Sequence, residues 1–201
     1  MVEVVHQPVL VKETLDLLAP PDGETLMIDG TLGEGGHAEA FLSTYENLSL
    51  VGIDADPGII ERARERLIEF GDRVRIEHAW FNRFFSAYPK DLDRPDVILL
   101  DLGISLYHYE RSNRGFSFQK DEALDMRLDE GLETSAADIL NQYPEKEIAS
   151  VLMTYGEERY SRRIADAIVR ERSENPIKST QQLAEIVKKS VPAEYRHGRI
   201  H

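Results

Sequence analysis

A glycine-rich segment near the N-terminus constrains the fold of this chain most strongly. Four glycines lie within residues 30–36, between an apolar run at 25–28 and a helical pattern at 38–45. Because glycine has no Cβ, such a segment lets a polar or anionic ligand lie against backbone N–H groups at the start of a helix. A tight turn without a ligand would need only one or two glycines. The segment therefore predicts a ligand-binding turn between a strand and a helix.

Three further apolar runs follow, and helical patterns separate them. The predicted strands cover residues 25–28, 48–54, 74–78 and 95–101, and the predicted helices cover 8–18, 38–45 and 57–70, with a short helix or loop at 81–88. Nearly continuous apolar strands that alternate with helices indicate a parallel sheet covered on both faces. The fold class is therefore α/β, and in such sheets ligands bind beyond the carboxyl ends of the strands.

Three of the predicted strands run into an aspartate at the carboxyl end. Asp29, Asp54 and Asp101 are therefore expected at one rim of the sheet. Asp54 ends the strand after the glycine-rich segment, where an acid can accept hydrogen bonds from both hydroxyls of a ribose. A helix-capping role fits Asp56 better, because Pro57 follows it. The pattern favours a nucleoside or nucleotide ligand.

The spacing of the glycines distinguishes two kinds of nucleotide ligand. From Gly30 the pattern is G-x-x-G-x-G-G, which differs from the G-x-G-x-x-G fingerprint of dinucleotide-binding proteins. Asp29 and Glu34 place carboxylates where they would repel a pyrophosphate but attract a sulfonium or an ammonium group. The segment thus favours S-adenosylmethionine and a methyltransferase over NAD and an oxidoreductase.

Asp101 lies where a methyl acceptor would meet this cofactor. Its carboxylate can accept a hydrogen bond from an exocyclic amine and orient the nitrogen lone pair toward the methyl group. A role in cofactor binding alone fits the sequence equally well. Asp101 is therefore the candidate catalytic residue, with both roles open.

The pattern changes after the fourth predicted strand. Residues 103–120 form a polar and aromatic loop, and from residue 135 only helices are expected, over 135–141, 144–155, 157–172 and from 179 onward. We therefore expect three parts. They are a Rossmann-like cofactor-binding domain over 1–106, a substrate-side loop over 107–134 and a helical subdomain over 135–201.

The substrate-side loop carries candidate RNA contacts. Arg114, Phe116 and Arg127 could stack on a base splayed from RNA and hold its phosphate. A loop that packs its own aromatic side chains into a core explains the same residues at least as well.

The composition excludes several kinds of site and indicates a location. The 201 residues include no cysteine, which excludes disulfides, thiolate zinc sites and cysteine nucleophiles, and the six histidines are too scattered for a metal site. No apolar run approaches the roughly 20 residues of a membrane span, so we expect a cytoplasmic protein. The net charge is −13, yet residues 156–201 carry 10 Lys or Arg against 7 Asp or Glu. That basic end could meet phosphate, or it could be a set of solvated helix faces.

Taken in order, the segments of this chain resemble the bacterial RsmH (MraW) family. The matching segments are 6–10, 29–37, 52–56, 101–105, 114–118, 124–127, 135–138 and 155–158. The resemblance implies a class I S-adenosylmethionine-dependent methyltransferase fold, a Rossmann-like parallel sheet with an inserted all-helical subdomain. It also implies methylation of N4 of a cytidine in the decoding region of 16S rRNA, with the small ribosomal subunit as partner.

The same resemblance assigns individual residues. It implies that the cofactor site is formed by Gly35, Gly36 and His37, by Asp54 at the ribose, by Phe81 beside the adenine and by Asp101 as the site acid. His108 stands where the family has a cofactor-contacting glutamine, and an imidazole can still make one hydrogen bond there. The family also continues beyond residue 201, so we expect the chain to lack the last strands of the sheet. The alternative function is a non-catalytic RNA or ribosome-assembly module that keeps cofactor binding without turnover.

Overall fold

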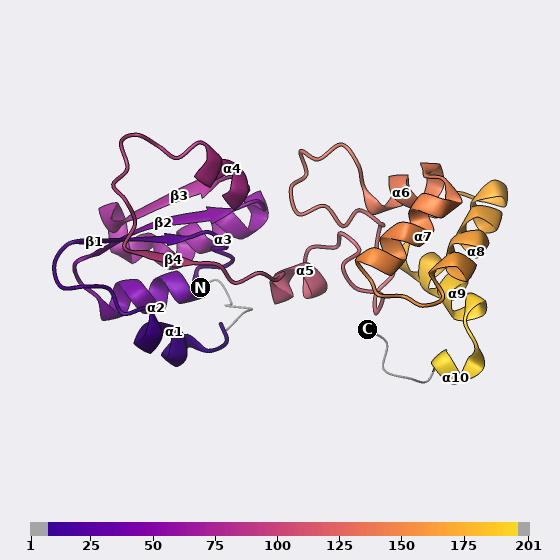
Figure 1. The fold of residues 1–201 in the computed structure, drawn as a ribbon, viewed down its shortest axis with the longest axis horizontal. Helices are drawn as coiled ribbons and strands as arrows, with labels where there is room; N and C mark the ends of the chain where they lie inside the picture. The colour runs from indigo at the N-terminus through magenta and orange to yellow at the C-terminus, as the bar shows by residue number, and fades with distance from the viewer. Residues whose placement is uncertain (1–7, 197–201) are drawn as a thin grey trace. The chain divides into compact units, whose positions relative to one another are not determined.

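The structure is a computed structural model that describes residues 8–196. It divides into two compact units, one up to Tyr107 and one from His108 onward (Figure 1). Residues 6 and 7 of the first matching segment, and residues 197–201 of the predicted helical subdomain, lie outside the described residues. The short helix α5 (Leu106–Glu110) contains the boundary between the two units.

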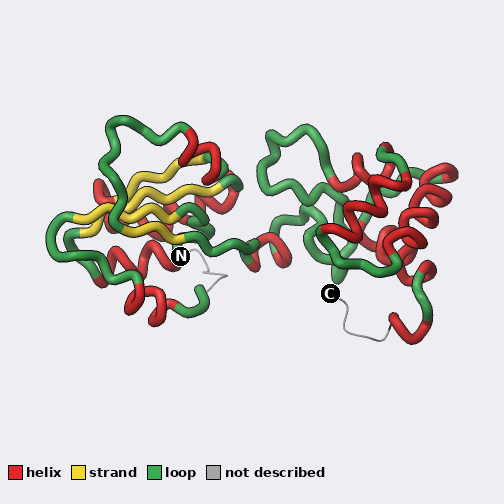
Figure 2. Tube along the Cα trace, in the orientation of Figure 1, coloured by secondary structure: helices red, strands yellow, loops and turns green. Residues whose placement is uncertain are grey.

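A four-stranded parallel sheet forms the centre of the first unit. Its strands are β1 (Thr25–Asp29), β2 (Leu48–Asp54), β3 (Val74–His78) and β4 (Val97–Leu99), shown in yellow in Figure 2. The order is β3-β2-β1-β4, and every pair is parallel. The chain thus builds outward from β1 in one direction and then crosses to its other side. This makes the carboxyl ends of β1 and β4 the switch point where ligands bind in such folds.

Helices cover both faces of this sheet, as the apolar strands predict. The helices of the first unit are α1 (Val11–Leu17), α2 (Gly36–Thr44), α3 (Pro57–Leu67), the 3-10 helix η1 (Ile68–Arg73) and α4 (Phe81–Ser86). On one face, Phe41 of α2 and Leu67 of α3 pack with Met27 of β1. On the other face, Phe84 of α4 packs with Ile28 and its neighbours. The predicted α/β fold class is confirmed.

The ends of some elements differ from the sequence prediction. The fourth strand was expected over 95–101, but β4 contains only Val97–Leu99, so Asp101 lies two residues beyond it. The chain leaves the sheet there because the Asp101 N–H donates to the Thr31 hydroxyl, at 2.7 Å, instead of to a strand carbonyl. The third predicted helix ends at Leu67 rather than near residue 70, and Gly71 has a φ of 53° in the 3-10 turn that follows.

The second unit is helical. After α5 it contains α6 (Ala136–Gln142), α7 (Glu145–Thr154), α8 (Ser161–Glu174), α9 (Thr180–Ser190) and α10 (Ala193–Arg196). Ser135 caps α6 in a capping box with Asp138, and Ser179 caps α9. The predicted four helices are present, whereas α5 and α10 were missed because five and four residues are too short to show a helical period.

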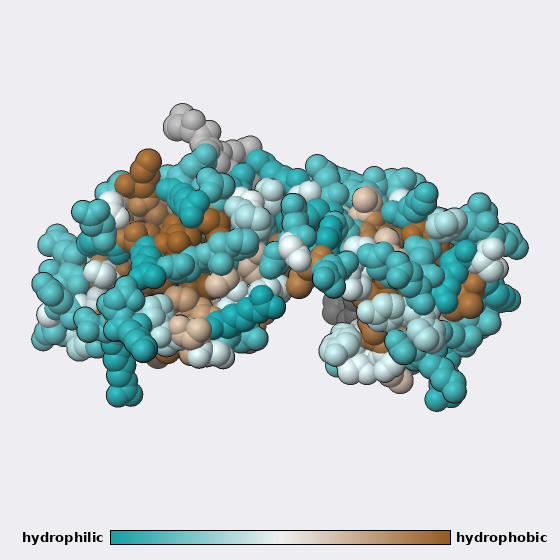
Figure 3. Space-filling model, turned by 90° about the horizontal axis from the view of Figure 1, so that it is seen from above, coloured by the Kyte–Doolittle hydropathy of each residue, from teal (hydrophilic) through white to brown (hydrophobic). Residues whose placement is uncertain are grey.

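Most of the surface on the face drawn in Figure 3 is hydrophilic, with patches of apolar side chains between the polar ones. Among residues 8–196, no helix has both the length and the apolar character that crossing a membrane requires.

Candidate cofactor site and substrate-side loop

The glycine-rich segment is tied by its backbone to the two strands that flank β1. The Gly30 N–H donates to the Leu99 carbonyl of β4, and the Leu32 N–H donates to the Ile53 carbonyl of β2, both at 2.9 Å. Gly33 and Gly35 have φ angles of 55° and 79°, where side chains are strained. Part of the glycine content is therefore required by the path of the chain itself.

Asp54 joins the same segment to the end of β2. One carboxylate oxygen accepts the Gly33 N–H and the other accepts the Asp56 N–H, each at 2.9 Å. These two bonds fix the carboxylate at the end of β2, beside the glycine-rich segment. Asp56 accepts the Gly58 N–H at 2.8 Å and caps α3, which confirms the predicted cap.

Asp29 is the most deeply buried acid of the site, with 1% of its surface exposed. It accepts the Thr31 N–H at 3.1 Å. Burial above all, together with the negative charges of Asp54 and Asp101, raises the pKa of Asp29 to about 7 against the lowering effect of the hydrogen bond from Thr31. The structure therefore brings these three acids together at the switch point of the sheet.

Thr31 links these acids and was not predicted as a site residue. Its N–H donates to Asp29, and its hydroxyl accepts the N–H of Asp101. Asp101 itself is exposed at the rim. Thr31 lies two residues after Asp29, the last residue of β1, and this position was the available signal, but only the pairing of β4 with β1 reveals its partner.

Glu34 changes the electrostatic interpretation of the segment. Its side chain is 5% exposed and forms an ion pair with Arg62 of α3, so its charge is balanced. The Arg62 guanidinium therefore weakens the attraction of a cationic ligand that the sequence predicts for Glu34. One oxygen, Oε2, is nevertheless buried and has no hydrogen-bond partner among the described residues. A buried carboxylate oxygen without a partner in this segment fits a ligand that supplies a hydrogen-bond donor there.

The other predicted cofactor residues of the first unit lie around the same segment. Gly35 is the N-cap of α2, and Gly36 and His37 form its first turn. His37 is 9% exposed, and its Nδ1 lies 3.5 Å from the Thr14 hydroxyl of α1. Phe81 begins α4 beside Gly30, where an added Cβ would lie 3.4 Å from the Phe81 Cβ. The structure therefore gathers these residues at one end of β1.

His108 belongs to the second unit. Its ring is 3% exposed and packs edge-to-face on Phe116, with centroids 5.1 Å apart. The described contacts of His108 are thus those of a core side chain of the substrate-side loop.

The two predicted RNA-binding arginines hold the substrate-side loop together. Arg114 donates to the carbonyls of Arg127 and Leu128 at 2.9 and 3.1 Å. Arg127 donates to both carboxylate oxygens of Asp125 at 2.7 Å and holds the pKa of that carboxyl below its usual range. It also donates to the carbonyls of residues 130 and 132. These contacts favour the structural interpretation of the two arginines.

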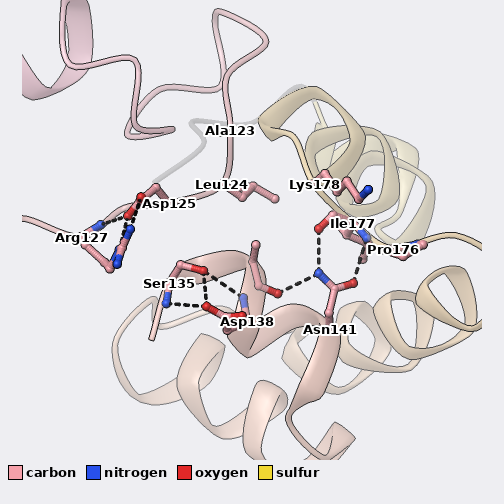
Figure 4. A pocket seen from close by; sticks show the side chains of 11 residues that line it. Ala123, Leu124, Asp125, Arg127, Ser135, Asp138, Asn141, Pro176, Ile177 and Lys178 are labelled. Carbon is pink, nitrogen blue, oxygen red and sulfur yellow. Dashed lines mark hydrogen bonds and ion pairs between the residues drawn. The ribbon is translucent and has the colours of Figure 1, made fainter. Parts of the chain in front are cut away.

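A hollow of about 440 Å³ lies beside this loop in the second unit (Figure 4). Its polar side chains bond to each other or to the backbone: Arg127 to Asp125, Asp138 to Ser135, and Asn141 to the backbone of Ile177. The hollow therefore presents few unsatisfied polar groups of its own, and its polar lining fixes the loop against α6 and the segment before α9.

The first unit, with its glycine-rich turn and acids at the switch point, defines a class I methyltransferase-like α/β protein. The model of the MraW methylase family matches residues 3–201, and the chain therefore belongs to this family. It is 53% identical over 197 residues to ribosomal RNA small subunit methyltransferase H of Treponema denticola, covering 98% of this chain and 62% of that protein. The protein of the same name from Salinispora arenicola is 45% identical over 204 residues, with 54% of its length covered.

The chain thus spans about 54% to 62% of the length of these relatives. A solved rRNA methylase from Streptococcus thermophilus matches 46% of this chain and 54% of its own, at 15% identity and a TM-score of 0.34.

Proposed function

We propose that the protein is an S-adenosylmethionine-dependent methyltransferase that modifies N4 of a cytidine in the decoding region of 16S rRNA. The observation that carries the proposal is the cluster of Asp29, Asp54 and Asp101 around the glycine-rich segment at the switch point. The family and the names of its relatives support rRNA of the small subunit as the substrate. A cytoplasmic location follows from that substrate.

In this proposal the first unit binds the cofactor. The residues of this unit that would hold it are Gly35, Gly36, His37, Asp54, Phe81 and Asp101. The resemblance to the family also assigns a cofactor contact to His108. When bound, S-adenosylmethionine supplies a methyl group on an already activated carbon. The protein therefore has to position the acceptor rather than activate it.

Asp101 is the residue that would position the acceptor. It is exposed at the rim, and its backbone is fixed by Thr31. Its carboxylate would accept a hydrogen bond from the exocyclic amine of cytidine and direct the nitrogen lone pair at the methyl group. Binding the cofactor alone is the second role open to Asp101.

The substrate-side loop would present the RNA. Arg114 and Arg127 keep only part of their donor capacity for a phosphate, because both donate to loop carbonyls. Phe116 is half-buried against His108. We therefore propose that these three residues act on RNA by shaping the loop over residues 107–134, with the helical subdomain over 135–201 as its support.

A second candidate is a non-catalytic RNA or ribosome-assembly module that binds the cofactor without turnover. It is favoured by the edge of the sheet beside Asp101. Within the described residues β4 pairs only with β1, and Ile98 and Leu100 are 47% and 42% exposed. The apolar edge leaves the candidate catalytic residue beside an incompletely covered strand.

Calorimetry with S-adenosylmethionine, S-adenosylhomocysteine and NAD, followed by methyl transfer to 30S subunits that lack the modification, tests both candidates. Binding of NAD alone would overturn the proposal. Binding of S-adenosylhomocysteine without methyl transfer would favour the second candidate.

Asp54→Ala tests the cofactor site directly. We expect weaker binding of S-adenosylhomocysteine by about 1–3 kcal/mol, because charge-assisted hydrogen bonds are lost. Asp54→Asn is the matched control for shape, and urea unfolding measures the loss of the bonds to Gly33 and Asp56 separately. An unchanged dissociation constant would remove Asp54 from the site.

A further inference from the structure

Two stretches of the chain each carry three arginines within five residues, and the structure treats them differently. In α3 every arginine of the stretch 62–66 forms an ion pair with a glutamate, and the pairs are Arg62–Glu34, Arg64–Glu61 and Arg66–Glu39. In the stretch 159–163, at the start of α8, no arginine forms an ion pair with a carboxylate of the described residues. The positive charges of the second stretch are therefore not balanced by ion pairs with carboxylates of the described residues.

The two arginines inside α8 face solvent. The buried face of this helix is formed by Ser161, Ile164, Ala165 and Ile168. Arg162 and Arg163 lie on the opposite side, and both are exposed. The next acid along the exposed face, Asp166, is occupied by Arg170 at 2.9 Å. The first turn of α8 thus presents two adjacent guanidinium groups to solvent.

Arg159 is ordered by aromatic rings instead of by an acid. Its guanidinium lies 4.5 Å from the ring centroid of Tyr195 and 5.2 Å from that of Tyr160. The neighbouring carboxylate of Glu158 accepts the Tyr195 hydroxyl at 3.0 Å and the Tyr160 N–H at 2.7 Å. Stacking on a ring fixes the guanidinium plane and leaves its N–H edge able to bind an anion.

An exposed aromatic residue lies on the turn that leads to these arginines. Tyr155 follows α7 and is 84% exposed. The turn after it folds back on α7, because the Glu158 N–H donates to the Leu152 carbonyl at 3.1 Å. A ring presented in this way is available as a stacking platform for a base.

We propose that Tyr155, Arg159, Arg162 and Arg163, the arginine surface, bind single-stranded RNA through its phosphates and one base. The proposal rests on the proposed function, since it names where the RNA substrate is held. A chain with a net charge of −13 can meet a polyanion only at a local cationic surface. Guanidinium groups bind phosphate oxygens in a bidentate manner, and an unpaired guanidinium does so without first breaking an ion pair.

The test compares two double variants of the full chain. Arg162→Ala with Arg163→Ala removes two unpaired charges, whereas Arg170→Ala with Lys188→Ala removes two charges that are paired with Asp166 and Glu185. Binding of an in vitro transcript of small-subunit rRNA is measured between 50 and 200 mM salt. We expect the slope of log K against log salt to fall by about 1 per lost arginine in the first variant and to stay near that of the unsubstituted protein in the second. Equal slopes in the two double variants would overturn the arginine surface.

Tyr155 is tested by a conservative pair. Tyr155→Ala should weaken RNA binding about tenfold with an unchanged salt slope, and Tyr155→Phe should keep the affinity, because stacking needs the ring and not the hydroxyl. Equal affinity of the two variants would overturn the stacking role.

Calorimetry with S-adenosylhomocysteine on the same proteins separates this proposal from the proposed function. If the unsubstituted protein binds S-adenosylhomocysteine and RNA, and the Arg162→Ala, Arg163→Ala variant binds RNA equally well, only the proposal of the arginine surface is overturned. A protein that binds neither ligand overturns both proposals.

Discussion

The glycine-rich segment at 30–37 and the substrate-side loop at 107–134 both connect regular elements and both contain glycines and charged residues. The first is held by neighbouring strands, whose carbonyls accept the N–H groups of Gly30 and Leu32. The second is held by backbone bonds such as that from the Met126 N–H to the Arg114 carbonyl, and in addition the side chains of Arg114 and Arg127 donate to its carbonyls. In the first loop carboxylates and a hydroxyl accept backbone N–H groups, whereas in the second arginine side chains donate to backbone carbonyls, so the second uses its cationic groups for its own fold.

The largest effect that tests this comparison is expected at Gly115. Its φ is 80°, and an added Cβ would collide with the Ala123 carbonyl oxygen. We expect Gly115→Ala to lower the free energy of unfolding by more than about 3 kcal/mol, since strain and collision add. Gly103→Ala is the control, because nothing lies within 4 Å of its added Cβ. Urea unfolding followed by circular dichroism that shows equal stability for the two variants would contradict a rigid loop.

The next effect concerns the buried acid of the glycine-rich segment. Burial raises the pKa of Asp29 from 3.8 to about 7, so the folded protein holds a proton that the unfolded chain releases. The stabilising contribution of Asp29 to the free energy of unfolding is fully present below about pH 4. It is lost as the pH rises toward 7, by up to about 1.4 kcal/mol per pH unit.

Asp29→Asn removes this titration. Between pH 5 and pH 7 the free energy of unfolding of the unsubstituted protein should fall by about 2 kcal/mol more than that of Asp29→Asn. Asp16→Asn, at an exposed position of α1, is the control and should follow the unsubstituted protein. Parallel pH profiles for Asp29→Asn and the unsubstituted protein would show that Asp29 is ionised throughout.

Arg127→Ala tests how far arginine side chains hold the substrate-side loop. We expect a loss of about 2 kcal/mol of stability, because the bidentate contact with Asp125 and the carbonyl contacts are removed together. Arg127→Lys keeps the charge but cannot make the bidentate contact, so it should recover less than half of the stability that Arg127→Ala loses. Lower RNA affinity with unchanged unfolding free energy would instead identify Arg127 as an RNA contact.

The smallest expected effect lies at Thr31. Thr31→Val removes the acceptor of the Asp101 N–H and should speed hydrogen exchange of that amide about fivefold, which corresponds to about 1 kcal/mol. Thr31→Ser keeps the hydroxyl and should keep the protection. NMR exchange rates that are equal in the two variants would show that Thr31 does not fix the chain at Asp101.

Much of the first unit could be predicted from local sequence signals. The runs at 48–54 and 74–78 became β2 and β3 without change, and Asp56 with Pro57 marked the start of α3. Apolar periodicity, caps and turn residues act over a few neighbours along the chain, so they are readable without the fold. The end of β4 was mispredicted because it depends on Thr31, which is distant in sequence.

The sequence by itself determined the α/β class, the glycine-rich turn and the acids that end up beside it. Only the tertiary structure decided which charges remain available to a ligand. Glu34 and the arginines of α3 form ion pairs, Arg127 is bound to its own loop, and the arginines at the start of α8 form no ion pair with a carboxylate of the described residues. The physical reason is that pairing depends on distances between side chains brought together by packing, and residue type and spacing along the chain do not contain those distances.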